Sequence, residues 1–180
     1  HHPSTVTLCG ASKSFWGGLR VGWIRAPREL MPALVSARLT LDLGAPVLEQ
    51  LVLTDLLGHR EQIVNERRAA IVATRDSLVD ALRTRLPQWR FRMPEGGLCL
   101  WVELPDALST PLCAAADQRG VVLAPGAQFA VEGGMERFLR LPFTGHAPEV
   151  VDDAVERLAL AWADARSARP SRHGRSPLVA

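Results

Sequence analysis

The sequence predicts a mixed α/β fold, in which an incomplete pair of strands is joined by a helical connector to a small α+β domain. Three observations support this prediction. Short apolar segments bounded by glycine or proline occur near both ends of the chain, and two segments between them carry apolar residues at helical spacing. The hydrophobic fraction of 47% and the charged fraction of 22% are those of an ordinary globular protein.

Residues 1–45 predict two strands and the beginning of a helical region. Residues 5–9 form an apolar strand, expected to be buried, that ends at Gly10, and residues 19–25 form a second strand. A loop over residues 11–18 joins them, and Pro27 begins a helix with apolar residues at helical spacing. Two strands are too little sheet to be stable alone. We therefore expect residues 1–45 to be the incomplete end of a larger domain, with an exposed sheet edge.

Residues 46–86 predict a helical connector. Pro46 begins an apolar helix that stops at Gly58. A longer helix over residues 59–86 has its apolar residues on one face and most of its arginines on the other, and Pro87 ends it.

Residues 87–168 predict a small α+β domain. Strands are expected at 89–93, 98–104, 121–123 and 138–141, a short helix at 108–119 and an amphipathic helix at 146–166. The basic tail at 169–180 is expected to be disordered, because it combines arginine with serine, proline and glycine.

Composition excludes several functional classes. A net charge of +2 gives no indication that this segment binds nucleic acid. The three cysteines lack paired or metal-type spacing, which is typical of reduced thiols in a cytoplasmic protein, and we expect no metal site. No apolar run has the length of a membrane span, and the sequence does not open with a signal peptide.

A single lysine, Lys13, is present among the 21 basic residues. The composition favours arginine wherever charge alone is needed, so a retained lysine indicates chemistry that arginine cannot perform. Arginine stays protonated, whereas a lysine amine can lose its proton and attack a carbonyl. Chance also leaves a single lysine in some chains, so this observation needs support from a motif.

The motif lies between the first two strands. Lys13, on a tight loop at a strand end, can present its amine to an aldehyde held in a cleft. Arg20 begins the return strand and can hold a phosphate with its planar guanidinium. Ser12 and Ser14 supply hydroxyls that can reach the phosphate or orient the lysine. The alternative is a simple hairpin whose lysine and arginine are only solvated.

This stretch resembles the cofactor-lysine motif of fold-type I enzymes that use pyridoxal 5'-phosphate (PLP): Gly10-Ala-Ser-Lys-Ser-Phe-Trp-Gly-Gly-Leu-Arg-Val-Gly-Trp. The resemblance implies an α/β fold, the C-terminal half of an aminotransferase fold-type I domain that ends in a small α+β domain. It also implies that Lys13 bonds to the cofactor and moves a proton during catalysis, and that Ser12 and Arg20 bind the cofactor. Gly10 replaces a phosphate-binding serine of the family pattern, which predicts weaker phosphate binding or compensation by other groups.

Downstream residues resemble the same family in the same order. Residues 94–105 are similar to a strand that enters the active site after a Gly-Gly turn, and residues 120–129 to the next strand and loop. Residues 138–143 resemble the strand whose arginine binds a substrate α-carboxylate, which is Arg140 here. Arg137 is the weaker candidate, since Glu136 adjoins it. The alternative for Arg140 is an ordinary strand arginine that points to solvent.

The sequence of residues 12–27 resembles most closely that of the MocR subgroup of GntR-type transcriptional regulators. These proteins join a DNA-binding domain to an aminotransferase-like domain that binds PLP and senses an effector. The resemblance implies an amino-acid-like ligand, a homodimer, and DNA binding only through an N-terminal domain absent from these residues. The alternative is a free-standing class I/II aminotransferase that uses the same Lys13, Arg20 and Arg140. A third interpretation is a non-catalytic interaction domain, but the presence of the lysine argues against it.

Several cofactor-binding groups of the family lie upstream of the lysine, and this sequence contains no tyrosine. We therefore expect the 180 residues alone to bind PLP weakly or not at all.

Overall fold

The computed structural model describes residues 5–42 and 44–168, and it divides into two compact units. The first unit extends to Arg68 and the second begins at Ala69. This division falls inside the long helix of the expected connector. The tail at 169–180, for which we predicted disorder, lies outside the described residues.

The first unit begins with an antiparallel strand pair, β1 (Thr7–Gly10) and β2 (Gly22–Arg25), in which Gly10 lies opposite Gly22. A Cβ atom on Gly22 would lie 2.8 Å from the backbone oxygen of Cys9, so the close approach of the two strands requires glycine. The connection contains a helical turn, α1 (Ala11–Ser14), and a 3-10 turn, η1 (Gly17–Leu19), where we predicted a loop. The turn forms because the Phe15 N–H donates to the Ala11 oxygen at 2.9 Å.

The rest of the first unit is helical, as the sequence predicts. A 3-10 turn, η2 (Arg28–Leu30), leads into α2 (Met31–Leu39), and α3 (Val47–Gly58) precedes the long helix α4 (Arg60–Arg85). The predicted burial of the first strand is wrong: Leu8 is 74% exposed. A strand is buried by neighbours that cover its faces, and within the described residues this sheet consists of β1 and β2 alone.

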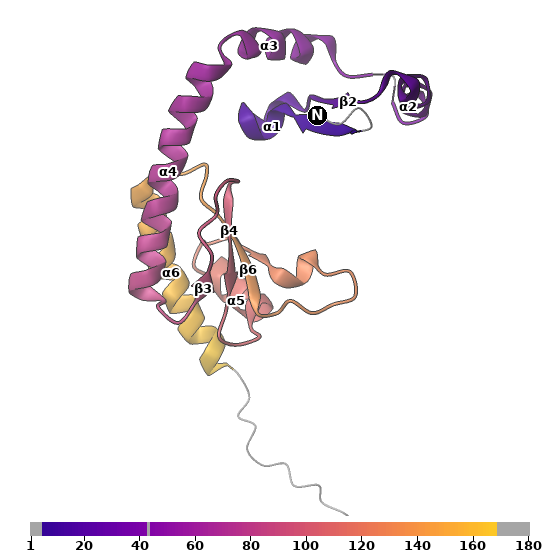
Figure 1. Ribbon diagram of the computed structural model, residues 1–180. Helices are drawn as coiled ribbons and strands as arrows, with labels where there is room; N and C mark the ends of the chain where they lie inside the picture. Colours follow the sequence, from indigo (N-terminus) through magenta and orange to yellow (C-terminus); the bar gives the residue numbers. More distant parts are fainter. Residues whose placement is uncertain (1–4, 43, 169–180) are drawn as a thin grey trace, which may run out of the picture. The chain divides into compact units, whose positions relative to one another are not determined.

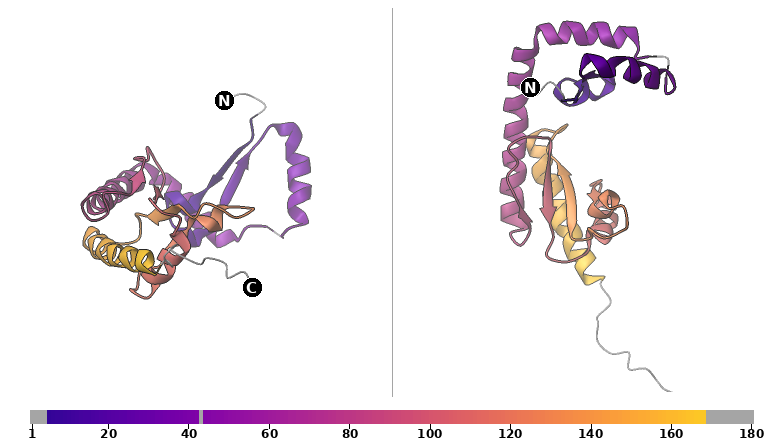
Figure 2. Two further views of the ribbon diagram at one scale, coloured as in Figure 1. Left: turned by 90° about the horizontal axis from the view of Figure 1, so that it is seen from below. Right: turned by 45° about the vertical axis from the view of Figure 1, so that its right-hand side comes forward.

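The second unit is a four-stranded antiparallel sheet covered by helices on one face. The strand order is β3-β4-β6-β5, and the strands are β3 (Arg90–Phe91), β4 (Cys99–Glu103), β5 (Ala124–Pro125) and β6 (Phe138–Pro142). The C-terminal part of α4 and the helix α6 (Pro148–Ser167) lie side by side next to the sheet (Figures 1 and 2). The helix α5 (Ser109–Asp117) packs against α6.

The core of the second unit fills the space between the sheet and these helices. Leu100, Val102 and Leu139 on the strands are fully buried against α4, α5 and α6. The rings of Trp89 and Trp162 meet edge to face in the same core, with centroids 5.6 Å apart. Along β4 and β6, buried residues alternate with residues that are less buried. The strands expected at 98–104 and 138–141 are therefore confirmed.

The strand expected at residues 121–123 forms only at Ala124 and Pro125. The reason is the way in which α5 ends. Gly120 has a φ of +76°, and the Val121 N–H donates to the Ala116 oxygen at 2.9 Å. The backbone of Val121 is therefore used in the turn that ends the helix, and the chain pairs with β6 three residues later than the apolar pattern predicts.

Candidate active site

Lys13 lies on the one-turn helix α1, between two anchored residues. Ala11 and Phe15 are buried in the core of the first unit, whereas Lys13 is exposed. Lys13 makes no hydrogen bond and no ion pair with any residue that the structure describes. Its amine is therefore held on a fixed backbone but remains available to a ligand.

Arg20 lies between two buried residues in the same way. Leu19 and Val21 are part of the first unit's core, and Arg20 between them is exposed. Its backbone has a φ of +51°, in the left-handed region that a residue with a Cβ adopts at a cost of about 1 kcal/mol or more. Within residues 5–42 and 44–168 its guanidinium has no partner. An unpaired cation on a strained backbone is typical of a functional position.

Ser12 and the glycine pair complete this connection. Ser12 is half-buried on α1, and its hydroxyl has no partner among the described residues. A Cβ on Gly18 would overlap the indole of Trp16, so glycine at this position lets the ring lie against the backbone. Ser12, Lys13 and Arg20 thus all lie on the short segment that connects β1 to β2.

Arg140 lies in the second unit, at the centre of β6. Its neighbours Leu139 and Leu141 are buried, so Arg140 projects from the opposite face of the sheet. Arg140 is unpartnered among the described residues, whereas the guanidinium of Arg137 donates to the backbone oxygen of Pro105. Of the two arginines considered for a carboxylate, Arg140 is therefore the one that is free to bind it.

Three aromatic residues beside Arg140 form a cluster that the sequence analysis did not assign to the site. Trp89 and Trp162 are buried in the core, whereas Trp101 is 40% exposed. Its ring stacks on Phe138 and meets Phe129 edge to face. Strand alternation could have indicated this, because Trp101 lies between Leu100 and Val102, which both face the core.

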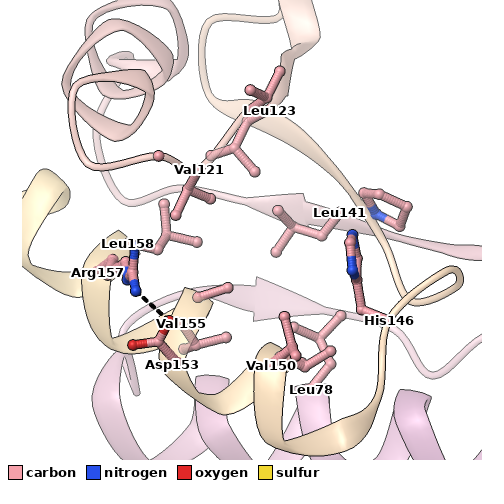
Figure 3. A pocket seen from close by; sticks show the side chains of 15 residues that line it. Leu78, Val121, Leu123, Leu141, His146, Val150, Asp153, Val155, Arg157 and Leu158 are labelled. Carbon is pink, nitrogen blue, oxygen red and sulfur yellow. Dashed lines mark ion pairs between the residues drawn. The ribbon is translucent and has the colours of Figure 1, made fainter.

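A separate cavity of about 400 Å³ lies in the second unit, between the segment after α5 and the N-terminal half of α6 (Figure 3). Its lining is mostly aliphatic, with Val121, Leu141 and Leu158 among the side chains that surround it. The charged residues Asp153 and Arg157 pair with each other at 2.7 Å. None of the predicted site residues lines it.

Glu136 fixes the start of β6 to the start of α5. Its carboxylate accepts hydrogen bonds from the Ser109 hydroxyl at 3.0 Å, the Thr110 N–H at 3.0 Å and the Thr110 hydroxyl at 2.8 Å. Burial raises the pKa of Glu136, but these hydrogen bonds together lower the pKa by more, so it lies below its ordinary value.

The thiol of Cys113 has a raised pKa. Burial, with a smaller contribution from Glu136, raises the pKa of Cys113 to about 11. At that pKa the thiol is mostly protonated at neutral pH, and a thiol is a weaker nucleophile than a thiolate.

The donor set of the first unit fits PLP. The cofactor presents an aldehyde, which needs a free amine, and a phosphate, which needs cations and hydroxyls. Lys13 supplies an amine, and Arg20 and Ser12 supply a guanidinium and a hydroxyl on the same segment, all three without a partner in residues 5–42 and 44–168. Among the described residues, no group of three or more His, Cys, Asp or Glu side chains could hold a metal ion. In the same part of the chain, no helix has the length and apolar character needed to cross a membrane.

Comparison with known proteins agrees with this chemistry. The 2-aminoadipate transaminase of Thermus thermophilus is 33% identical over 164 residues, which are 89% of this chain and 41% of that protein. The HTH-type transcriptional regulator TauR of Rhodobacter capsulatus is 29% identical over 154 residues, 83% of this chain and 32% of the regulator.

A solved structure has the same fold. The crystal structure of LysN, the alpha-aminoadipate aminotransferase of Thermus thermophilus complexed with N-(5'-phosphopyridoxyl)-L-leucine, matches with a TM-score of 0.84 and 30% identity. The match covers 90% of this chain and 42% of that one. The chain thus spans about two fifths of the length of these enzymes.

The family model of class I and II aminotransferases matches residues 1–158. The expected fold class is confirmed: the structure is a mixed α/β part of an aminotransferase fold-type I domain. The cofactor of this family is pyridoxal phosphate. This chain therefore belongs to the class I and II aminotransferases, a family of PLP-dependent, fold-type I proteins.

Proposed function

We propose that this chain is the PLP-binding, effector-sensing part of a GntR/MocR-type transcriptional regulator. The observation that carries the proposal is the segment between β1 and β2, which presents a Lys13 amine and an Arg20 guanidinium that have no partner among the described residues. The sequence of residues 12–27 supports the assignment to the regulator subgroup, and so does the similarity to TauR. DNA binding would come from another part of the natural polypeptide, which we expect to be a cytoplasmic homodimer.

Each predicted site residue has a separate role in this proposal. PLP, when bound, supplies an aldehyde that bonds to amines and a ring that withdraws electrons from neighbouring bonds. Lys13 would hold the cofactor through its Nζ amine and would hold or move a proton at that atom. Ser12 and Arg20 would hold the phosphate, for which a planar guanidinium is suited. Arg140 binds the carboxylate of an amino-acid-like ligand.

A specific observation favours a second function, that of a free-standing aminotransferase. The Thermus thermophilus transaminase is more similar to this chain than TauR is, at 33% against 29% identity. The same residues would then transfer an amino group between an amino acid and a 2-oxo acid. The two functions share the cofactor site and differ in what the rest of the polypeptide does.

The cofactor assignment is tested by trapping it on the natural polypeptide as its own cell makes it. Borohydride reduction fixes the bond between a lysine and PLP, and mass spectrometry of the digested protein locates it. We expect the added mass on the peptide that contains Lys13. The Lys13→Arg variant keeps the charge and should lose the adduct, because a guanidinium does not attack the aldehyde. A native protein without an adduct on the Lys13 peptide would overturn the proposal.

The choice between the two functions needs two further measurements on the same polypeptide. Its intact mass shows whether a DNA-binding domain accompanies the aminotransferase-like domain. The affinity for DNA upstream of its own gene, with and without amino acids, then shows whether ligand binding changes the output. Rapid transamination by a polypeptide without DNA affinity would establish the enzyme and reject the regulator.

A further inference from the structure

The sheet of the second unit has two chemically different faces. On the face that packs against the helices, Leu100, Val102 and Leu139 are fully buried. Successive residues of a strand alternate between the two faces, so Trp101 and Arg140 project from the other one.

Arg140 has an aromatic neighbour and a small neighbour on this open face. It lies opposite Trp101 on β4 and opposite Ala124 on β5. Side chains directly opposite in an antiparallel pair have their Cβ atoms about 5 Å apart and are in reach of each other. The acidic residue of this face, Glu103, lies opposite Arg90 and Phe138 instead. Arg140 therefore has an indole on one side, an alanine on the other and no carboxylate opposite it.

The aromatic cluster of Trp101, Phe129 and Phe138 is ordered and remains open to solvent. Trp101 stacks on Phe138 with centroids 5.7 Å apart and an angle of 13° between the rings, and it meets Phe129 at 5.4 Å and 84°. Trp101 is 40% exposed and Phe129 is 48% exposed. Exposed aromatic surface forgoes the free energy of burial, unless a ligand covers it.

The backbone that carries Phe129 is held close to β6. Phe129 ends the 3-10 turn η3 (Gly126–Phe129), and a Cβ on Gly126 would lie 2.7 Å from the backbone oxygen of Phe138. Glycine at Gly126 thus allows the turn to contact the start of β6. The edge-to-face contact with Trp101 then follows from a fixed turn and two paired strands, so the cluster is formed before any ligand binds.

We propose that the aromatic cluster is the side-chain subsite for the ligand whose carboxylate Arg140 binds. This inference depends on the role proposed above for Arg140. It makes the ligand an amino acid with an aromatic or large aliphatic side chain, because that side chain would cover Trp101 and Phe129 while the carboxylate pairs with the guanidinium. A dicarboxylic amino acid would bring its second carboxylate to a groove in which two acidic side chains, Glu95 and Glu103, offset the two arginines Arg90 and Arg92, so the groove offers that carboxylate no net attraction.

The test measures ligand selectivity by calorimetry, on the cofactor-loaded natural polypeptide. The ligands are L-phenylalanine, L-leucine, L-alanine and L-glutamate. We expect phenylalanine to bind about tenfold more tightly than alanine, because its side chain buries apolar surface of the aromatic cluster and alanine does not. Trp101→Ala should reduce this ratio to about twofold or less and leave the affinity for alanine nearly unchanged.

Two further variants keep the test interpretable. Phe129→Ala removes a second ring from a half-exposed position, so the selectivity can be measured even if Trp101→Ala does not fold. Val131→Ala is the matched control, because this neighbouring side chain is 101% exposed and lies outside the cluster. We expect the native selectivity in the control.

Equal affinity for phenylalanine and alanine in the native protein would overturn the inference, as would tightest binding of glutamate. An equal loss of affinity for all ligands in Trp101→Ala would do the same, since it would indicate a merely structural role. Failure of the proposed function is separate, because it would appear as the absence of the Lys13 adduct.

Discussion

The two units of this chain differ in how their residues are anchored. Among the described residues, the buried cluster of the first unit contains five side chains, and that of the second contains 21. The first unit leaves many large apolar residues exposed on β1, α2 and α3, whereas the second buries one face of a four-stranded sheet. The candidate cofactor lysine thus stands on the unit with the smaller core, and the candidate carboxylate-binding arginine on the unit with the larger one. Stability and function should therefore respond differently to substitutions in the two units.

The largest expected effect is a core truncation in the second unit. Leu82 is 0% exposed, and Leu82→Ala should lower the free energy of unfolding by about 3 kcal/mol, because it leaves a cavity among α4, α6 and the sheet. Urea unfolding followed by tryptophan fluorescence measures this loss. Leu48→Ala on α3 is the matched control, since Leu48 is 74% exposed and its truncation should cost less than about 0.5 kcal/mol. Equal costs for the two would contradict the comparison.

An intermediate effect is expected at Glu136, which joins β6 to α5. Glu136→Gln removes a charged acceptor of three hydrogen bonds and should cost the second unit about 1 kcal/mol at neutral pH. The pKa of Glu136 is lowered in the folded protein, so its contribution is complete above the unfolded pKa of about 4.3 and is lost as the pH falls through the folded pKa. The melting temperature between pH 6 and pH 3 should fall less in Glu136→Gln than in the native chain. If the melting temperature fell equally with pH in Glu136→Gln and in the native chain, the carboxylate would not stabilise the junction of β6 and α5.

The smallest effect is expected in the first unit, and it has the opposite sign. Arg20→Gly removes the strain of a left-handed residue and should raise local stability by up to about 1 kcal/mol, even though it removes the proposed phosphate ligand. Hydrogen exchange of the Ala11 amide reports this, because that N–H donates to the Val21 oxygen across the connection. Arg28→Gly on η2 is the control and should give faster exchange or no change at all. Faster exchange in Arg20→Gly would mean that the Arg20 side chain stabilises the fold rather than a ligand.

The sequence predicted most of the elements because their patterns are local. Apolar residues at helical spacing, Pro46 and Gly58 indicated α3 and α4, and short apolar segments bounded by glycine or proline indicated β4 and β6. The failures came from contacts that no local pattern encodes. The strand expected at 121–123 begins later because Val121 takes part in the turn that ends α5. The apolar strand β1 is exposed because, among the described residues, β2 alone pairs with it.

The residues of the candidate site divide in the same way. The sequence alone made Lys13, Ser12 and Arg20 candidates, because a single lysine beside serines, glycines and arginine indicates an amine and a phosphate site. Arg140 became a candidate through the resemblance of residues 138–143 to a strand of the family. Only the tertiary structure decided that Arg20 is left-handed, that Arg137 donates to the Pro105 oxygen, and that Trp101 lies opposite Arg140. It also decided that Arg20 and Arg140 have no partner in the part of the chain that the structure describes. The physical reason is that residue type fixes the chemistry a side chain can perform, whereas strand register and long-range packing fix which side chains face each other and which remain available to a ligand.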